Sequence, residues 1–271
     1  MKISCLPVSF FGAMQAGEMS VKDWVDAAKQ CGLDGIDLSM LLVANHTPVY
    51  LSQIKEDLSE LPLVMITSYP DFVHPDEIQR QREREYFYRD IALAGELGAQ
   101  YLRMTPGQAH PDMDRKQGIA LAIEAFKRSA DAARKHGVKL LFENHSKPGC
   151  WQYPDFSHPT DVFLEIADGI RDTGIGINFD TANTIVYGDD ALAVLNEVID
   201  QVVTVHAADT ATSGALNPTV IGEGIVPFDK IFSKLKEHGF DGWICIEEAS
   251  GTGVEGVKKA AEFVRTAWQG A

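Results

Sequence analysis

Four polar side chains stand where apolar runs end in the C-terminal half of the chain. A single carboxylate in such a place is as easily a solvated surface residue as a functional one. Three carboxylates and one imidazole on four consecutive runs are more typical of groups that gather at one site. The runs 138–142, 175–179, 202–205 and 243–246 are followed directly by Glu143, Asp180, His206 and Glu247.

This set of residue types predicts a metal centre. Three like charges held together are costly unless a cation offsets their repulsion. Three oxygen ligands and one imidazole nitrogen suit one divalent ion such as Mn²⁺, Mg²⁺, Co²⁺ or Zn²⁺, with coordination positions left open for a substrate.

The elements that must position these residues are short strands alternating with helices. The apolar runs lack polar alternation, which is typical of parallel strands buried on both faces. Helical patterns cover 83–97 and 116–136, and another begins at Ser20 with Asp23 as a capping-box variant. Four glycines, Gly32, Gly98, Gly137 and Gly239, each close a helical pattern before a strand. The predicted strands are 2–6, 35–39, 63–68, 100–104, 138–143, 175–179, 202–206 and 242–247.

Eight strands with helices between them predict an α/β fold, a single (β/α)8 TIM barrel. The 271 residues give about 34 per unit, as such barrels require. An open doubly wound sheet is the alternative, but no Gly-rich phosphate turn follows the first strand. No linker divides the chain, so we expect residues 1–271 to form one domain. Active sites of such barrels lie at the C-terminal ends of the strands, where the four polar residues stand.

Composition excludes several classes of partner. The chain has 39 acidic and 24 basic residues, a formal net charge of -15, which disfavours nucleic acid and anionic membranes. Its four cysteines show no close pairing. Pro7 and Gly12 interrupt the N-terminal apolar run, so it does not fit a secretory signal, and no run is long enough to span a membrane. We expect a cytoplasmic protein that acts on a small molecule.

The four residues and their neighbours carry a resemblance to a known family. The segments Asp180–Asn183, His206–Asp209 and Gly222–Gly224, together with Glu143 and Glu247, resemble the xylose isomerase-like barrel superfamily. The chain looks most like the branch that contains D-tagatose 3-epimerase, hydroxypyruvate isomerase and inosose dehydratase. The resemblance covers essentially the whole chain and is specific for fold and metal.

The resemblance implies roles for the four residues. Glu143 and Glu247 would be both metal ligands and acid/base groups, whereas Asp180 and His206 would be ligands only. Metal chelation of a ketose would stabilise an enediolate while one glutamate removes a proton and the other returns one.

The chain also departs from the epimerase pattern. Asn183 stands where the epimerases normally have a substrate-binding His. Thr212 stands where they commonly have an Arg, and Gly149 where they often have a second Glu. Apurinic endonucleases of the same superfamily use extra zinc-binding histidines, one of which would occupy the Asn183 position.

Several further residues are candidates for substrate binding. Arg103 and Lys147 would meet a carboxylate, phosphate or oxyanion, although Arg103 fits a salt bridge equally well. His145 would share a side of its strand with Glu143 and would donate a proton. Asp209 would orient His206 or bind a hydroxyl, or simply cap a loop.

Loops at the same end supply the remaining candidates. His110 lies in a polar loop that caps the barrel mouth, as does His74. The aromatic loop 147–155 is a predicted lid, in which Trp151 would stack on a sugar or, alternatively, pack on a neighbouring subunit of a homo-oligomer. Asn183 and Glu223 complete the set. The segment 250–253 resembles in position the phosphate cradle of such barrels.

We therefore expect a divalent-metal-dependent isomerase or epimerase of a small ketose, keto-acid or sugar phosphate that works through an enediolate, with manganese among the fitting metals. The alternative is a metal-dependent lyase, a dehydratase or decarboxylase, that acts on a keto-sugar, keto-inositol or sugar acid through the same enediolate. His145 and the departures at 149, 183 and 212 favour this alternative. A non-catalytic sugar-binding barrel is disfavoured because both glutamates are present.

Overall fold

The computed structural model describes residues 1–271 and contains eight parallel strands. Each predicted strand is confirmed to within one residue at either end. The hydrogen-bonded order β1-β8-β7-β6-β5-β4-β3-β2 makes a nearly closed barrel, a single (β/α)8 TIM barrel. The strands are β1 Lys2–Leu6, β2 Ile36–Ser39, β3 Leu63–Thr67, β4 Tyr101–Met104, β5 Lys139–Glu143, β6 Gly176–Asp180, β7 Val202–Ala207 and β8 Trp243–Glu247.

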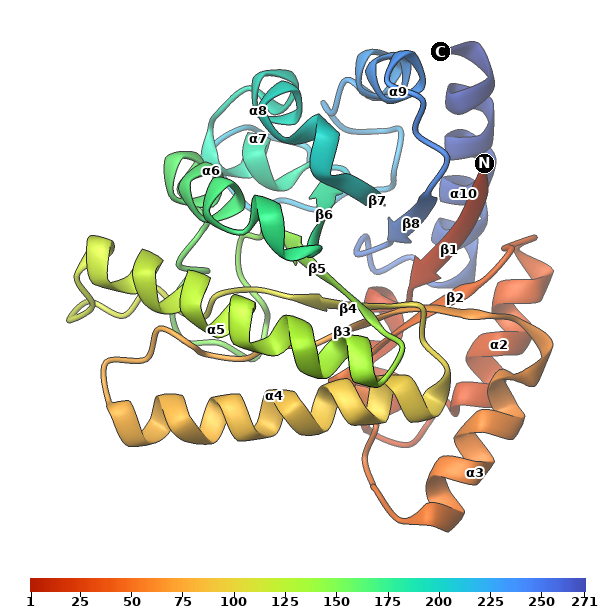
Figure 1. The fold of residues 1–271 in the computed structure, drawn as a ribbon. Coiled ribbons are helices and arrows are strands. Elements are labelled where there is room, and N and C mark those ends of the chain that lie inside the picture. Colours follow the sequence, from red (N-terminus) through yellow and green to blue (C-terminus); the bar gives the residue numbers. More distant parts are fainter.

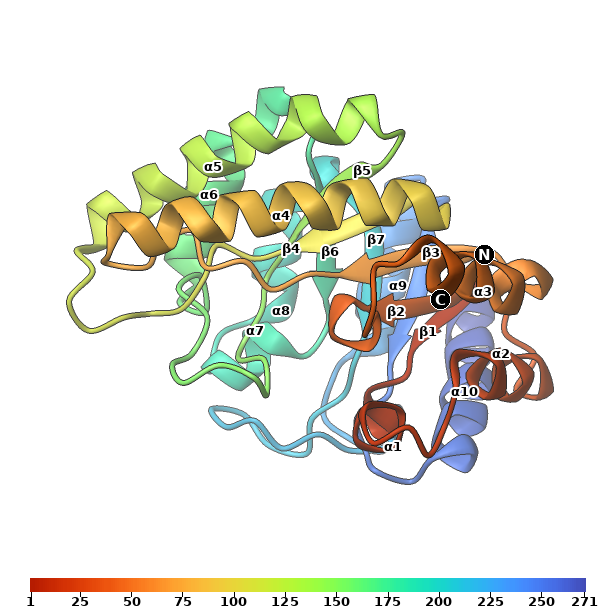
Figure 2. The same ribbon diagram turned by 90° about the horizontal axis from the view of Figure 1, so that it is seen from below.

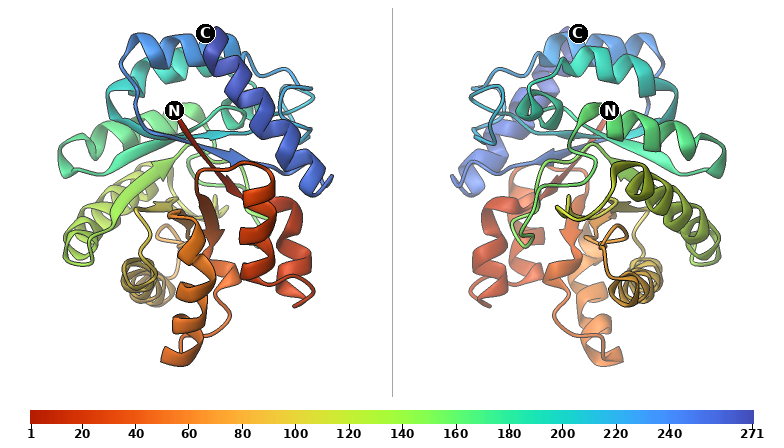
Figure 3. Two further views of the ribbon diagram at one scale, coloured as in Figure 1. Left: turned by 90° about the vertical axis from the view of Figure 1, so that its right-hand side faces the viewer. Right: turned by 90° about the vertical axis from the view of Figure 1, so that its left-hand side faces the viewer.

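Helices surround this sheet on its outer side (Figures 1 and 3). β2, β3 and β6 are buried along their whole length, which explains why their sequences lack polar alternation. The helices are α1 Phe11–Gln15, α2 Val21–Gln30, α3 Pro48–Asp57, α4 Glu77–Leu97, α5 Arg115–Lys135, α6 Thr160–Gly169, α7 Asn183–Tyr187, α8 Ala191–Val198, α9 Phe228–Glu237 and α10 Val254–Gly270. Short 3-10 turns occupy Val8–Phe10, Met40–Leu42, Leu58–Glu60, Arg171–Thr173 and Ile199–Gln201.

Helix ends follow local capping chemistry. The Ser20 hydroxyl accepts a hydrogen bond from the Asp23 amide, and the Asp23 carboxylate accepts one from the Ser20 amide, which confirms the capping box before α2. α4 begins six residues earlier than the predicted start at 83. Its first turns carry few apolar residues, but Asp76 caps them by accepting a hydrogen bond from the Gln79 amide.

The barrel has a seam between β1 and β2, because no backbone ladder joins these two strands. Two backbone hydrogen bonds to the Ile3 carbonyl, from the amides of Asp34 and Gly35 just before β2, and several side-chain bonds connect them instead. The Ser4 hydroxyl of β1 donates to Asp37 Oδ2 of β2 at 2.8 Å, and Asp37 Oδ1 accepts from the Met65 amide of β3 at 3.0 Å. The Ile3 amide also donates to Asp34 just before β2, at 2.9 Å. One fully buried carboxylate therefore ties three strands together inside the barrel.

Loops and short helices gather at the C-terminal ends of the strands. α1, α7 and the loop after β7 all lie at this end (Figure 2). None of the helices combines the length and apolar character needed to cross a membrane.

The buried carboxyl at the seam predicts a pH dependence of stability. Burial raises the pKa of Asp37 to about 6, above the value of about 3.9 in an unfolded chain. The stabilisation is therefore complete below pH 4 and is lost as the pH rises through 6. Between pH 4 and 8, the free energy of unfolding of the wild type should fall by roughly 2 kcal/mol more than that of Asp37→Asn. Urea unfolding at both pH values measures this difference, and equal falls would refute it.

Candidate metal centre and active site

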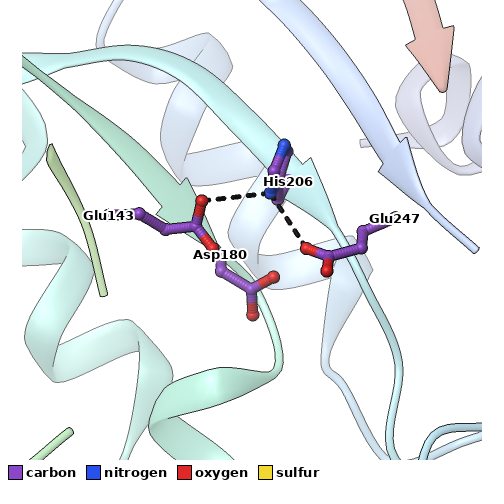
Figure 4. Close-up of side chains that lie close together, drawn as sticks. All are labelled: Glu143, Asp180, His206 and Glu247. Atoms are coloured by element: carbon purple, nitrogen blue, oxygen red, sulfur yellow. Dashed lines mark ion pairs between the residues drawn. The ribbon is translucent and has the colours of Figure 1, made fainter. Parts of the chain in front are cut away.

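The four predicted ligands meet at the C-terminal end of the barrel. They lie at or next to the last residues of four neighbouring strands, β5 to β8, and one donor atom from each lies within 4.8 Å of the other three. Figure 4 shows Glu143 and Glu247 on opposite sides of the His206 ring, with Asp180 beside them. His206 Nδ1 is 3.2 Å from Glu143 Oε2 and 3.0 Å from Glu247 Oε2.

Asp180 is held by the side chain of Asn144, the residue that follows β5, and by two amides just after it in the chain. Its amide donates to Asn144 Oδ1 at 2.8 Å, and Asn144 Nδ2 donates back to the Asp180 carbonyl at 2.9 Å. Asp180 Oδ1 accepts from the amides of Ala182 and Asn183, whereas Oδ2 is buried with no partner. One carboxylate oxygen is thus fixed by the start of α7 and the other is left free.

Glu143 is fixed in a similar way from two sides. Asn178 Nδ2 donates to Glu143 Oε2 at 2.8 Å, and the Thr204 hydroxyl orients that amide by donating to Asn178 Oδ1 at 2.7 Å. Arg103 Nε lies 3.0 Å from the same oxygen, so the predicted salt bridge of Arg103 is present. Glu143 Oε1 is buried without a partner.

Crowding of the carboxylates governs the electrostatics of the cluster. Burial, reinforced by Glu247 and Glu143, raises the pKa of Asp180 well above its usual value. Burial also opposes ionisation of Glu143, but Arg103 and His206 outweigh it and lower the pKa of Glu143. Both glutamates outweigh burial at His206 and raise the pKa of the imidazole. The raised pKa values favour protons on Asp180 and His206, and together with Arg103 these protons offset part of the negative charge of the cluster.

The donor set fits a divalent cation. Each of the four residues keeps at least one buried oxygen or nitrogen that makes no well-aligned hydrogen bond. These atoms are Glu143 Oε1, Asp180 Oδ2, both His206 nitrogens and Glu247 Oε2, although His206 Nδ1 and Glu247 Oε2 lie 3.0 Å apart as an ion pair. Unsatisfied buried groups are costly, and four that converge on one point are the arrangement that a metal ion would satisfy. Three oxygens and one nitrogen match the preference of several divalent first-row ions and of Mg²⁺.

A cavity of about 540 Å³ opens above this cluster. Asp180 and Glu247 lie on its wall, whereas Glu143 is fully buried behind it. The predicted substrate-binding residues divide into two groups. Those on the cavity wall are Arg103, His145, Lys147, Asn183 and Asp209, and those away from it are His110, Trp151 and Glu223.

The three residues away from the wall have other surroundings. His110 Nε2 lies 2.7 Å from Asp71 Oδ2, in a loop where Asp71 also accepts from Gln108. Trp151 is buried, with 9% of its surface exposed, and Glu223 is exposed to solvent. Direct contact of these side chains with a substrate stays a prediction from sequence.

Asp209 organises a loop. Its Oδ2 accepts hydrogen bonds from the amides of Gly222 and Gly224 at 2.9 and 3.0 Å, and its Oδ1 accepts from the amides of Thr210 and Val226. A Cβ on Gly224 would lie 2.2 Å from Asp209 Oδ1, so this close approach requires glycine. The loop-capping alternative therefore describes Asp209, and the Gly222–Gly224 motif is the partner of that carboxylate.

The segment 250–253 does not offer an empty phosphate cradle. Glu248, which is buried, accepts hydrogen bonds from the Ser250 amide at 2.9 Å and from the Ser250 and Ser9 hydroxyls. An internal carboxylate thus takes the place that an anion would need, and the expectation from position was wrong here.

Sequence reasoning missed three residues of the site. Tyr69 lines the cavity with its ring 4.9 Å from the Arg103 guanidinium carbon. Asn178 orients Glu143, and Asp155 is fully buried 3.7 Å from His145. Asn178 carried a usable signal, because a polar side chain in the middle of a buried strand requires a partner. The other two lie in loops where the sequence gives no spacing to follow.

Comparison with known proteins finds relatives in sequence and solved structures with the same barrel fold. An inosose dehydratase of Lacticaseibacillus casei is 25% identical over 49% of this chain and 47% of its own length, so the match covers about half of each protein. The D-tagatose 3-epimerase-like protein superposes with a TM-score of 0.80 at 19% identity, covering 99% of this chain and 97% of the other. A crystal structure of the IOLI protein with a bound zinc atom also superposes with a TM-score of 0.80, at 17% identity, covering 99% of this chain and 98% of the other.

The family model described as xylose isomerase-like TIM barrel matches residues 25–267, which is most of the chain. The barrel, the convergent donor set and this match lead to one conclusion: the chain belongs to the xylose isomerase-like TIM barrel family.

Proposed function

We propose that the protein is a divalent-metal-dependent isomerase or epimerase of a small ketose, keto-acid or sugar phosphate, acting through an enediolate. One observation carries the proposal: Glu143, Asp180, His206 and Glu247 bring donor atoms within 4.8 Å of one another next to a cavity whose wall includes Asp180 and Glu247. Family membership supports it, because relatives of this chain include enzymes named as epimerases and dehydratases.

The four residues would hold the metal, with Mn²⁺, Mg²⁺, Co²⁺ and Zn²⁺ as the fitting ions and Mn²⁺ our first choice. When bound, the ion supplies Lewis-acid polarisation of a substrate carbonyl and stabilises negative charge on the adjacent oxygens.

We assign proton transfer to the two glutamates, which would act from either side of a bound substrate. Glu247 reaches the cavity wall, and its side chain is 19% exposed, so a bound substrate meets it directly. Glu143 lies opposite, and Arg103 holds the pKa of its carboxyl below the usual range, which keeps it ionised. The ionised carboxylate takes the proton from the carbon next to the carbonyl, and the other glutamate, which must enter this step as the protonated carboxylic acid, gives its own proton to the opposite face or the neighbouring carbon.

The cavity wall supplies the contacts that orient a substrate. Lys147 and Arg103 are its only cationic side chains, and either would pair with an anionic substituent. Asn183 would bind a hydroxyl. We keep the predictions that the protein is cytoplasmic and that its partner is a small carbohydrate; a homo-oligomer is equally compatible with the fold.

A lyase that acts through the same enediolate is the second candidate, and His145 favours it. The ring lines the cavity two residues beyond Glu143, where it can donate a hydrogen bond to a departing hydroxyl. Burial lowers the pKa of His145 to about 4, so the imidazole is neutral at pH 7 and donates through its N–H.

Metal dependence has a direct test. Metal-free protein titrated with Mn²⁺ should unfold at a higher temperature, with a stabilisation of about 3 kcal/mol when free metal reaches 100 times the Kd. Asp180→Asn should lose most of this shift, whereas Asp172→Asn, on the exposed turn before β6, should keep it. Absence of a shift with all four metals would contradict the proposed centre.

Proton transfer by Glu247 is tested by isotope exchange. Metal-loaded protein incubated with candidate ketoses in D₂O should place deuterium on the carbon next to the carbonyl. Glu247→Gln should reduce this exchange at least a hundredfold while leaving far-ultraviolet circular dichroism unchanged. Glu255→Gln, on the exposed first turn of α10, is the matched control. Wild-type exchange in Glu247→Gln would refute the role.

Substitution of His145 together with product analysis distinguishes the two candidate reactions. For a lyase, His145→Ala should lower formation of the unsaturated product more than tenfold, because the departing hydroxyl loses the hydrogen bond that stabilises its developing negative charge. Deuterium exchange into recovered substrate should stay within a few-fold of wild type. Product analysis by mass spectrometry reads both quantities. An isomerised product and no unsaturated product in the wild type would decide for the isomerase.

A further inference from the structure

Two buried side chains beside the active-site cavity face each other with incomplete hydrogen bonding. His145 Nδ1 lies 3.7 Å from Asp155 Oδ2, and neither atom has a hydrogen-bond partner. Asp155 has no exposed surface, and His145 is 7% exposed. An unpaired buried carboxyl oxygen and an unpaired ring nitrogen each cost free energy, and a small approach would satisfy both.

The other oxygen of Asp155 is already committed. Asp155 Oδ1 accepts from the Ser157 amide at 2.8 Å and from the Ser157 hydroxyl at 2.7 Å. These two bonds fix the plane of the carboxyl group and leave Oδ2 directed away from Ser157. The orientation of the carboxyl toward His145 is therefore a product of local structure and needs no ligand.

We propose that Asp155 is a positioning residue: its Oδ2 hydroxyl donates a hydrogen bond to His145 Nδ1 and so directs the Nε2–H of the ring into the cavity. The inference rests on the proposed function in one respect, that His145 meets the substrate. The positioning itself follows from the Asp155, Ser157 and His145 geometry alone.

The protonated form of the carboxyl supports this direction of donation. Burial raises the pKa of Asp155 to about 8, so the group carries its proton at pH 7. A carboxyl that holds its proton is a donor, and the Nδ1 lone pair is then the acceptor. The buried Thr105 hydroxyl also acts on this carboxyl and favours its ionised form, although burial outweighs it, so Thr105 is the rival hydrogen-bond partner of Asp155.

The backbone of Asp155 also links this pair to the predicted lid. Its amide donates to the Ser146 carbonyl at 2.7 Å, which closes the loop between these two residues at its base. The tip of that loop, residues 147–150, lines the cavity. A substrate that presses on the tip therefore acts on the same short segment that carries both His145 and Asp155, and it can shorten the 3.7 Å contact to a full hydrogen bond.

Nitrogen-15 NMR of the histidine rings tests the tautomer without requiring turnover. The protein is loaded with diamagnetic Zn²⁺ or Mg²⁺, and His145→Gln assigns the signal. In the wild type we expect Nδ1 unprotonated and Nε2 protonated. Asp155→Asn can still accept from Ser157 and donate to Nδ1, so it should keep this tautomer, whereas Asp155→Ala should give a mixture. A protonated Nδ1 in the wild type, or an unchanged signal in Asp155→Ala, would overturn the proposal.

Kinetics supply the second readout once a substrate is known. Asp155→Ala should lower kcat about tenfold with KM within threefold of wild type, and Asp155→Asn should retain at least half of kcat. Thr105→Val, which removes the rival hydrogen-bond partner of Asp155, should leave the tautomer unchanged. Equal losses in Asp155→Asn and Asp155→Ala would refute donation to Nδ1. Failure to find any substrate would count against the proposed function only, because the NMR result stands apart from it.

Discussion

The structure depends on one costly arrangement, three carboxylates packed around a single imidazole at the buried floor of a cavity. Arg103 and Asn178 stabilise Glu143 from behind, and the first turn of α7 stabilises one oxygen of Asp180. These supports neutralise part of the charge and leave the oxygens and nitrogens that face the centre unsatisfied. The carboxylates still repel one another in this arrangement, and a bound cation would relieve that repulsion, so the cluster favours cation binding.

Much of this site could be predicted from the sequence because parallel strands impose a common direction. Once eight apolar runs are recognised, their last residues must lie at one end of the barrel, and Glu143, Asp180, His206 and Glu247 follow. Loop residues obey no such rule. Asp155 approaches His145, and Glu248 fills the turn before α10, through side-chain contacts that no periodicity encodes. Chain position predicts the loop of His110 near the barrel mouth, and the family motif suggests Glu223, whereas contact with the cavity depends on how each loop folds back.

The cluster of Glu143, Asp180, His206 and Glu247 fits the proposed proton removal, whereas the residues of the cavity wall fit both the isomerase and the lyase reaction. In the proposed mechanism, proton removal next to a carbonyl requires only the metal-ligand cluster. The fate of the resulting enediolate would then depend on the residues of the cavity wall, which include His145, Lys147 and Asn183. Relatives named as epimerases and as dehydratases differ in reaction class while sharing this fold, which is consistent with the wall as the variable part.

The seam between β1 and β2 bears on how the barrel moves. Backbone ladders join seven strand pairs, whereas the β1–β2 junction has only the two bonds to the Ile3 carbonyl and a few side-chain bonds, so it is the weakest line of the barrel. Strand separation there would break the Ser4–Asp37 bond without disturbing any strand that carries a metal ligand except β8, which β1 pairs. Local opening is then favoured first at β1 and β2 and last at β5 and β6, so Glu143 and Asp180 lie on the two strands farthest from the seam, whereas Glu247 lies on β8 directly beside β1.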